Sequence, residues 1–233
     1  MVRMKPLRIY LLSLLLLAAC AVKTPQPQLP AVPGAPVETG EAWHQQAARS
    51  GKKVWPVDTA QSLITITVRR GGALARLGHD HVVASRTISG FVAPDAGRAD
   101  FHFRLDQMTV DEPALRSAAG LDTQPSAEAI EGTRENMLTR VLDAGRYPVV
   151  MLHAERVAGA RDMLRLTVTL HGTARTVDVP VTIEQTKTSI AASGELKLLQ
   201  TDFGITPMSV MGGAMVVRDP MELRFKIVAT ARR

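Results

Sequence analysis

Residues 163–183, MLRLTVTLHGTARTVDVPVTI, decide the fold, because apolar and polar side chains alternate on both sides of a short break that contains glycine. Such alternation is typical of antiparallel strands buried on one face. The break, HGTAR at 171–175, therefore predicts a hairpin turn between two strands. The apolar positions that share a face are Leu164, Leu166, Val168 and Leu170 before the break, and Val177, Val179, Val181 and Ile183 after it.

The same period of two recurs outward from this hairpin, from Val54 to the end of the chain. It is clearest in LITITVRR (63–70), ADFHFRLDQMTV (99–110) and MELRFKIVA (221–229). Many short strands at close spacing favour an all-β barrel or sandwich. The segments that predict strands, about nine of them, are 54–58, 62–70, 80–92, 99–110, 149–157, 163–170, 176–184, 191–200 and 221–231.

One segment has a different period. SAEAIEGTRENMLTRVLDAG (126–145) places apolar side chains at helical spacing and ends in Gly145, which suits a helix stop. The pattern predicts an inserted amphipathic helix that covers an edge or an end of the sheet. The preceding LRSAAGLDTQPS (115–126) predicts a loop.

The first twenty residues, MVRMKPLRIYLLSLLLLAAC, form a targeting segment: a basic start is followed by an apolar run from Ile9 to Leu17. That run is far shorter than the roughly 20 residues needed to cross a bilayer. Its end, LAAC, resembles the bacterial lipobox, in which the thiol of the cysteine, here Cys20, is diacylated and the cysteine becomes the new N-terminus. Ala21 in the next position implies sorting to the outer membrane. The alternative is an ordinary signal peptide cleaved after Ala19, which would leave Cys20 as a free thiol.

The expected organisation is a signal peptide (1–19), a lipidated Cys20 with a Pro-rich disordered tether (20–53), and one barrel domain (54–233). Five prolines between Pro25 and Pro36 favour an extended tether, in which His44 would be solvated. Cys20 is the only cysteine, so no disulfide can form within the chain. Removing the three basic residues of 1–19 lowers the formal charge from +6 to about +3, which gives no support to nucleic-acid binding.

The barrel region resembles the YceI-like, polyisoprenoid-binding family. The matching stretches, in order along the chain, are WPVD (55–58), SGFV (89–92), RYPVV (146–150), LTVTLHGTARTVDVPVTI (166–183) and SGELKLLQTDFGI (193–205). The resemblance implies a lipocalin-like antiparallel β-barrel of about eight strands, often dimeric, so a homodimer is among the expected partners. It also implies a long apolar cavity that holds an isoprenoid-type lipid, a quinone or a polyprenyl lipid, with no other cofactor.

Such a cavity needs distributed apolar side chains rather than a motif, since burial contributes about 0.8 kcal/mol per CH₂-sized unit of the lipid. The methionines of ITPMSVMGGAMVV (205–217) could adapt to such a ligand or be ordinary core and loop residues. The candidates for the apolar lining are Ile64, Ile66, Phe101, Phe103, Leu166, Val168, Val179, Val181 and Phe225.

The polar candidates gather around GHDH (78–81). On a strand, His79 and His81 would share a face, and we match His81 to the strand histidine of the family. Three interpretations stay open: the histidines are satisfied structural groups, they contact a lipid headgroup with help from Arg69 and Arg76, or they bind a metal. A metal site needs a third ligand, for which His102 and His153 are the candidates. The alternative metal set is therefore His79, His81 and His153.

The sequence therefore predicts a periplasmic lipoprotein, anchored to the outer membrane surface by Cys20, that binds an isoprenoid-type lipid without catalysis. No GxSxG, P-loop or GxGxxG motif is present, and the only cysteine is committed to the lipobox. The alternatives are a metal-binding protein or metal-dependent enzyme centred on His79 and His81, and a structural envelope lipoprotein whose interior is filled by side chains.

Overall fold

The structure is a computed structural model that describes residues 40–121 and 123–231. The expectations for the signal peptide (1–19), for Cys20 and for the tether as far as residue 39 lie outside the described residues. None of the helices in these two ranges is long and apolar enough to span a membrane.

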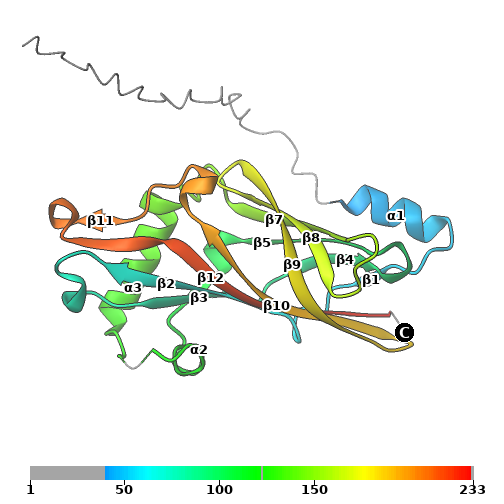
Figure 1. Cartoon of the computed structure of the whole chain (residues 1–233), viewed down its shortest axis with the longest axis horizontal. Helices are drawn as coiled ribbons and strands as arrows, with labels where there is room; N and C mark the ends of the chain where they lie inside the picture. Colours follow the sequence, from blue (N-terminus) through cyan, green and yellow to red (C-terminus); the bar gives the residue numbers. More distant parts are fainter. Residues whose placement is uncertain (1–39, 122, 232–233) are drawn as a thin grey trace, which may run out of the picture. The chain divides into compact units, whose positions relative to one another are not determined.

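The described ranges are built mainly of β-strands (Figure 1). The strands are β1 (Trp55–Pro56), β2 (Leu63–Gly71), β3 (His81–Ser85), β4 (Ser89–Ala93), β5 (Arg98–Arg104), β6 (Thr109–Val110), β7 (Val149–Arg156), β8 (Met163–Leu170), β9 (Thr173–Gln185), β10 (Ser189–Leu199), β11 (Ser209–Val210) and β12 (Met215–Thr230). The α-helices are α1 (Glu41–Arg49), α2 (Pro113–Ala118) and α3 (Ala127–Asn136), which continues into the π-helical turn η4 (Met137–Val141). The 3₁₀ turns are η1 (Ala75–Leu77), η2 (Pro94–Ala96), η3 (Leu105–Gln107), η5 (Thr201–Phe203) and η6 (Met211–Gly213).

The strands form one antiparallel sheet in the order β1-β4-β5-β7-β8-β9-β10-β12-β2-β3-β6, with β11 paired to β12. The sheet curls, because the chain just after β1 also reaches β12: Val57 bridges to Ala229, and the Asp58 N–H donates to the Val228 carbonyl at 2.7 Å. The all-β, antiparallel prediction is confirmed. The expected strand number of about eight is wrong, since the curled half-barrel has a 12-stranded sheet.

Two of the expected strands are interrupted, which accounts for much of the difference. The segment 80–92 breaks between Ser85 and Ser89, so β3 pairs with β2 and β6, whereas β4 pairs with β1 and β5. Ile88, in the break, is fully buried and fills the corner where the chain changes partners. The segment 99–110 is likewise divided by η3, which separates β5 from the short β6.

The predicted helix is confirmed as α3 with η4, and its apolar stripe packs against the main core. The residues of that stripe are Ile130, Met137, Leu138, Val141 and Leu142. The expectation that 115–126 is a loop is partly wrong, because its first four residues belong to α2. Pro113 at the first turn has the backbone angle that a helix start requires, and Arg116 is the buried residue of this helix.

The expected disorder of the tether does not extend to residue 53, and the expectation that His44 is solvated is wrong. Residues 41–49 form α1, which contacts β4. His44 is 1% exposed, and its Nε2 lies 2.8 Å from Oδ2 of Asp100 on β5. Asp100 also accepts hydrogen bonds from Arg98 at 2.7 Å and from His153 at 2.6 Å. Burial raises the pKa of Asp100, but these three donors outweigh it and hold the pKa well below its usual value.

Three of the stretches that carry the family resemblance meet at one place in the fold: RYPVV (146–150), the hairpin at 166–183 and SGELKLLQTDFGI (193–205). His171 and Gly172, both with positive φ (52° and 72°), form the two-residue turn between β8 and β9, as predicted. The Tyr147 ring packs on His171 with 4.6 Å between ring centroids, and a Cβ on Gly172 would lie 2.6 Å from Cε1 of Tyr147. The buried Phe203 accepts a hydrogen bond from Nδ1 of His171 through its carbonyl at 3.4 Å. These contacts give the three stretches a structural role.

Candidate functional site

The inner face of the curled sheet and the apolar stripe of α3 and η4 enclose a cavity of about 330 Å³. This volume falls within the range of small-ligand pockets, and its lining is overwhelmingly apolar. The structure places all nine apolar candidates on the lining: Ile64, Ile66, Phe101, Phe103, Leu166, Val168, Val179, Val181 and Phe225. Their contact with a ligand stays a prediction.

His81, at the start of β3, contributes a polar group to this apolar lining. Its Nδ1 lies 2.6 Å from Oδ2 of Asp111, whose side chain is fully buried. The other oxygen, Oδ1, accepts from the Val82 N–H at 3.0 Å and from the Arg116 guanidinium at 2.6 Å. Burial raises the pKa of Asp111, but these hydrogen bonds, led by that of His81, outweigh it and hold the pKa below its usual value.

This network determines which nitrogen of His81 keeps its hydrogen-bonding capacity. An ionised Asp111 can only accept, so Nδ1 of His81 carries the proton of their hydrogen bond. Among the described residues, Nε2 of His81 has no hydrogen-bond partner. In the neutral ring Nε2 accepts a hydrogen bond from a hydroxyl, and in the protonated ring it donates to a carbonyl or a phosphate.

The neighbouring polar groups of the lining are already committed. Thr133 donates to the Ala129 carbonyl at 2.7 Å and Asn136 to the Gly132 carbonyl at 2.8 Å, so both are occupied within α3. Gln200 donates to the backbone carbonyl of Arg218 at 2.9 Å. Each of these side chains thus uses a donor within the protein, whereas no described residue bonds to Nε2 of His81.

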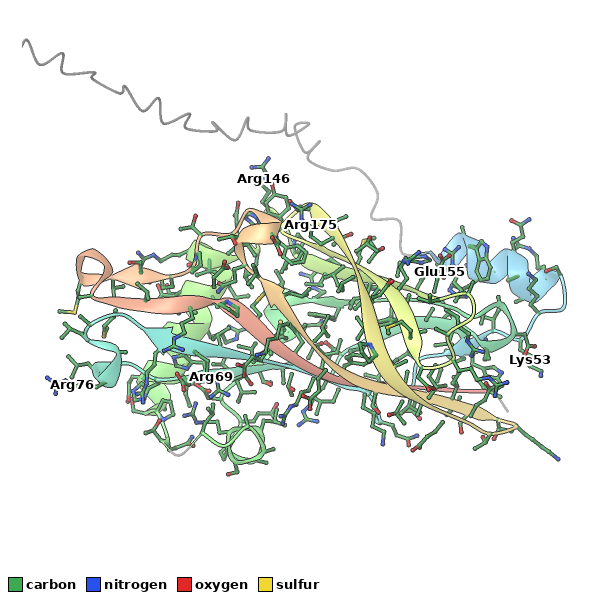
Figure 2. The ribbon with its side chains drawn as sticks, viewed as in Figure 1. Lys53, Arg69, Arg76, Arg146, Glu155 and Arg175 are labelled. Atoms are coloured by element: carbon green, nitrogen blue, oxygen red, sulfur yellow. The ribbon has the colours of Figure 1, made fainter. Side chains whose placement is uncertain are left out.

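The other headgroup candidates lie off the lining. Arg69 pairs with Glu222 at 3.1 Å and with Asp80 at 3.4 Å, and Arg76 projects away from the connection between β2 and β3 (Figure 2). His79 also falls outside the lining, because β3 begins only at His81 and the strand alternation does not reach back to it. Of the four headgroup candidates, the structure therefore places only His81 on the cavity lining. The contact of any of them with a lipid headgroup stays a prediction.

The alternative metal set is not brought together. The ring centroids of His79 and His81 are 6.2 Å apart, but His153 lies on β7, where Nδ1 hydrogen-bonds to Asp100 and Nε2 lies 3.2 Å from the Glu155 carboxylate. Within residues 40–121 and 123–231, no group of three or more His, Cys, Asp or Glu side chains has the geometry to hold a metal ion. His102, the other third-ligand candidate, lies on β5 with a buried, unpartnered Nδ1.

Two features of the site were not identified from the sequence. Asp111 and Arg116, which orient His81, are 30 and 35 residues further along the chain, and no local pattern links them to it. Arg156 lines the cavity among residues of η2 and β5 and is exposed. The alternation of β7 did contain this signal, since Arg156 continues the inward series Val150, Leu152 and Ala154.

Comparison with known families agrees with the fold. The YceI-like domain matches residues 55–229, most of the chain. The protein therefore belongs to the YceI-like family. None of the curated proteins searched matches it.

Two solved structures resemble the chain in fold. One is a polyisoprenoid binding domain from Saccharophagus degradans implicated in plant cell wall breakdown, with a TM-score of 0.54, 13% identity and coverage of 76% of this chain and 98% of that one. The other is BcnA of Burkholderia cenocepacia, with a TM-score of 0.53, 20% identity and coverage of 75% and 99%. At these identities the likeness shows the shared fold.

Proposed function

We propose that this protein binds an isoprenoid-type lipid, a quinone or a polyprenyl lipid, in the cavity of the curled sheet and catalyses no reaction on it. The observation that carries the proposal is the continuous apolar lining contributed by both halves of the sheet and by η4. Each buried CH₂-sized unit contributes about 0.8 kcal/mol, so affinity would come from the length of hydrocarbon enclosed. The polyisoprenoid binding domain of similar fold supports the same class of ligand.

In this proposal His81 orients the lipid by its polar end. The hydrogen bond from Nδ1 to Asp111 fixes the ring of His81, a lining residue, and would leave its Nε2 for the ligand. A neutral ring would select a lipid with a hydroxyl, whereas a protonated ring would select a quinone carbonyl or a phosphate. The remaining contacts are apolar and would tolerate lipids of different length.

The cellular setting is also part of the proposal. The lipobox-like LAAC supports acylation of Cys20 and attachment to the outer membrane on its periplasmic side. An acyl anchor would hold the barrel close to the membranes from which its cargo comes. A dimer of this chain is compatible with the proposal, but the function needs only one cavity per chain.

The direct test fills the cavity from inside. In the full chain, Val168→Trp adds bulk to the lining, while Thr167→Trp changes the neighbouring residue on the opposite face of β8. A prenylated quinone and a polyprenyl phosphate are titrated into each delipidated variant. We expect Val168→Trp to lose uptake and Thr167→Trp to keep it; equal uptake by both would contradict binding in this cavity.

A further inference from the structure

Two glycine-containing loops lie together at one end of the sheet: residues 72–78, between β2 and β3, and residues 211–214, between β11 and β12 (Figure 1). We call them the tip loops. The Leu74 N–H donates to the Ala214 carbonyl at 2.8 Å, which joins the loops. Gly72, with φ of 87°, permits this approach, because a Cβ there would lie 2.5 Å from the Ala214 carbonyl oxygen.

Each tip loop presents a large apolar side chain to the outside. Only three large apolar side chains are strongly exposed in the part of the chain that the structure describes; Met211 (65%) and Leu77 (57%) are the most exposed, and Leu199 (39%) is the third. Met211 also has a positive φ of 53°, which is uncommon and strained for a residue other than glycine. The fold therefore holds Met211 outward although both its exposure and its backbone are unfavourable, which points to a partner that covers it.

The charges beside these side chains favour an anionic partner. Arg76, next to Leu77, and Arg218, on the strand that follows the second loop, are exposed and form no ion pair with another described residue. Arg76 projects away from the sheet (Figure 2). Asp80, the acidic residue near the first loop, is already paired with Arg69 at 3.4 Å and Arg70 at 3.8 Å, so it leaves Arg76 uncompensated.

The tip loops are continuous with the cavity. Gly71 and Arg70, which lead into the first loop, pair with Val216 and Val217, which follow the second. Val217 itself lines the cavity, and its N–H donates to the carbonyl of Met208, another lining residue, at 2.8 Å. His81, with its free Nε2, begins β3 three residues after the first loop. The exposed apolar tip and the polar group of the cavity therefore lie at the same end of the sheet.

We propose that the tip loops dock on an anionic lipid bilayer, with Leu77 and Met211 inserted into the apolar boundary and Arg76 and Arg218 on the headgroups. The inference rests on the proposed function, because a docked tip would place the His81 end of the cavity at the membrane and let lipid exchange without crossing water. Apolar side chains flanked by arginines are the combination that binds such an interface. A protein partner would be expected to bury the tip equally, and the test separates the two.

The test uses the single cysteine of the chain. Cys20→Ser in the full chain leaves no thiol, so Met211→Cys accepts one environment-sensitive nitrobenzoxadiazole label at the tip. Lys187→Cys, in the turn between β9 and β10, is the matched control. With vesicles of phosphatidylcholine and phosphatidylglycerol, we expect a blue shift and brightening at position 211 and none at 187. Unchanged spectra at 211, or equal changes at both positions, would overturn the proposal.

Substitutions test the two parts of the contact. Leu77→Asp and Arg76→Glu should each weaken vesicle binding tenfold or more, and salt should weaken it in the parent chain, because the arginine contact is screened. Leu199→Asp, the control for general loss of exposed apolar surface, should leave binding unchanged. If Leu199→Asp reduced binding as much as Leu77→Asp, the tip would not be the contact.

Lipid extracted from the same samples separates this inference from the proposed function. A chain that carries extractable lipid but whose labelled tip ignores vesicles would overturn docking and leave lipid binding standing. A tip that responds to vesicles in a chain that neither carries nor takes up lipid would support docking and overturn the proposed binding of lipid in the cavity. A tip that responds only to a protein added from the envelope, and not to vesicles, would overturn docking on a bilayer.

Discussion

Asp111→Ala should destabilise the fold strongly, because it removes one member of a buried ion pair and leaves the other. The side chains of Asp111 and Arg116 are 0% and 1% exposed, with Nη1 of Arg116 at 2.6 Å from the carboxylate. The same carboxylate holds the Val82 N–H and His81. Leaving a buried charge without its partner costs about 3–5 kcal/mol. For a domain of this size that corresponds to a fall in Tm of roughly 6–20 °C.

The assay is calorimetric unfolding of the full chain with two further variants. Glu112→Ala breaks the exposed pair with Arg86 and should cost less than about 1 kcal/mol. The double variant Asp111→Ala with Arg116→Met removes both charges and should recover much of the loss. A loss for Asp111→Ala no larger than that for Glu112→Ala, or a double variant no more stable than the single one, would refute the reasoning.

The pH dependence gives a second check on the same pair. The folded-state pKa of Asp111 lies below its usual value, so the stabilisation is fully present above the unfolded pKa of about 3.9 and is lost as the pH falls below it. The difference in stability between the parent chain and Asp111→Asn should therefore shrink as the pH is lowered below about 4. A difference that grew on acidification would show that the carboxylate is not held ionised by its partners.

Three further predictions concern α1, acid stability and the ligand. His44→Ala should cost about 1–3 kcal/mol in denaturant unfolding, because it leaves buried Asp100 short of a donor, while Gln45→Ala on the exposed side of α1 should be near neutral. Since the pKa of Asp100 is depressed, its contribution to the free energy of unfolding is also present above about pH 4 and lost below it. Parallel curves of stability against pH for the parent chain and Asp100→Asn between pH 6 and 3 would rule out this contribution. His81→Phe should weaken the binding of a prenyl lipid with a polar end about tenfold, yet leave the uptake of a pure hydrocarbon such as squalene unchanged. Equal losses for the two lipids would show that His81 acts only through packing.

The apolar half of the candidate site could be predicted from the sequence because it depends on a local property. Successive residues of a strand point to opposite faces, so the alternation around Val168 and Val181 already separates cavity from solvent. The same rule extends to Arg156, which continues the inward series of β7.

The polar half depends on contacts between distant residues, which no local pattern records. His81 and Asp111 are 30 residues apart, and His44 and Asp100 are 56 apart, so neither network could be read from spacing. The break after Ser85 has a similar origin: the sequence predicts a single strand over residues 80–92, but the curl of the sheet requires the chain to change partners at buried Ile88. Tertiary structure decided these positions over local pattern.

The measurement that tests the central claim most directly is native mass spectrometry of the full chain, isolated under conditions too mild to strip bound lipid. The account predicts a discrete adduct that extracts into organic solvent as an isoprenoid-type lipid and that is lost from Val168→Trp but kept by Thr167→Trp. A chain that shows its bare mass, and that takes up no prenyl lipid on titration, would contradict the account.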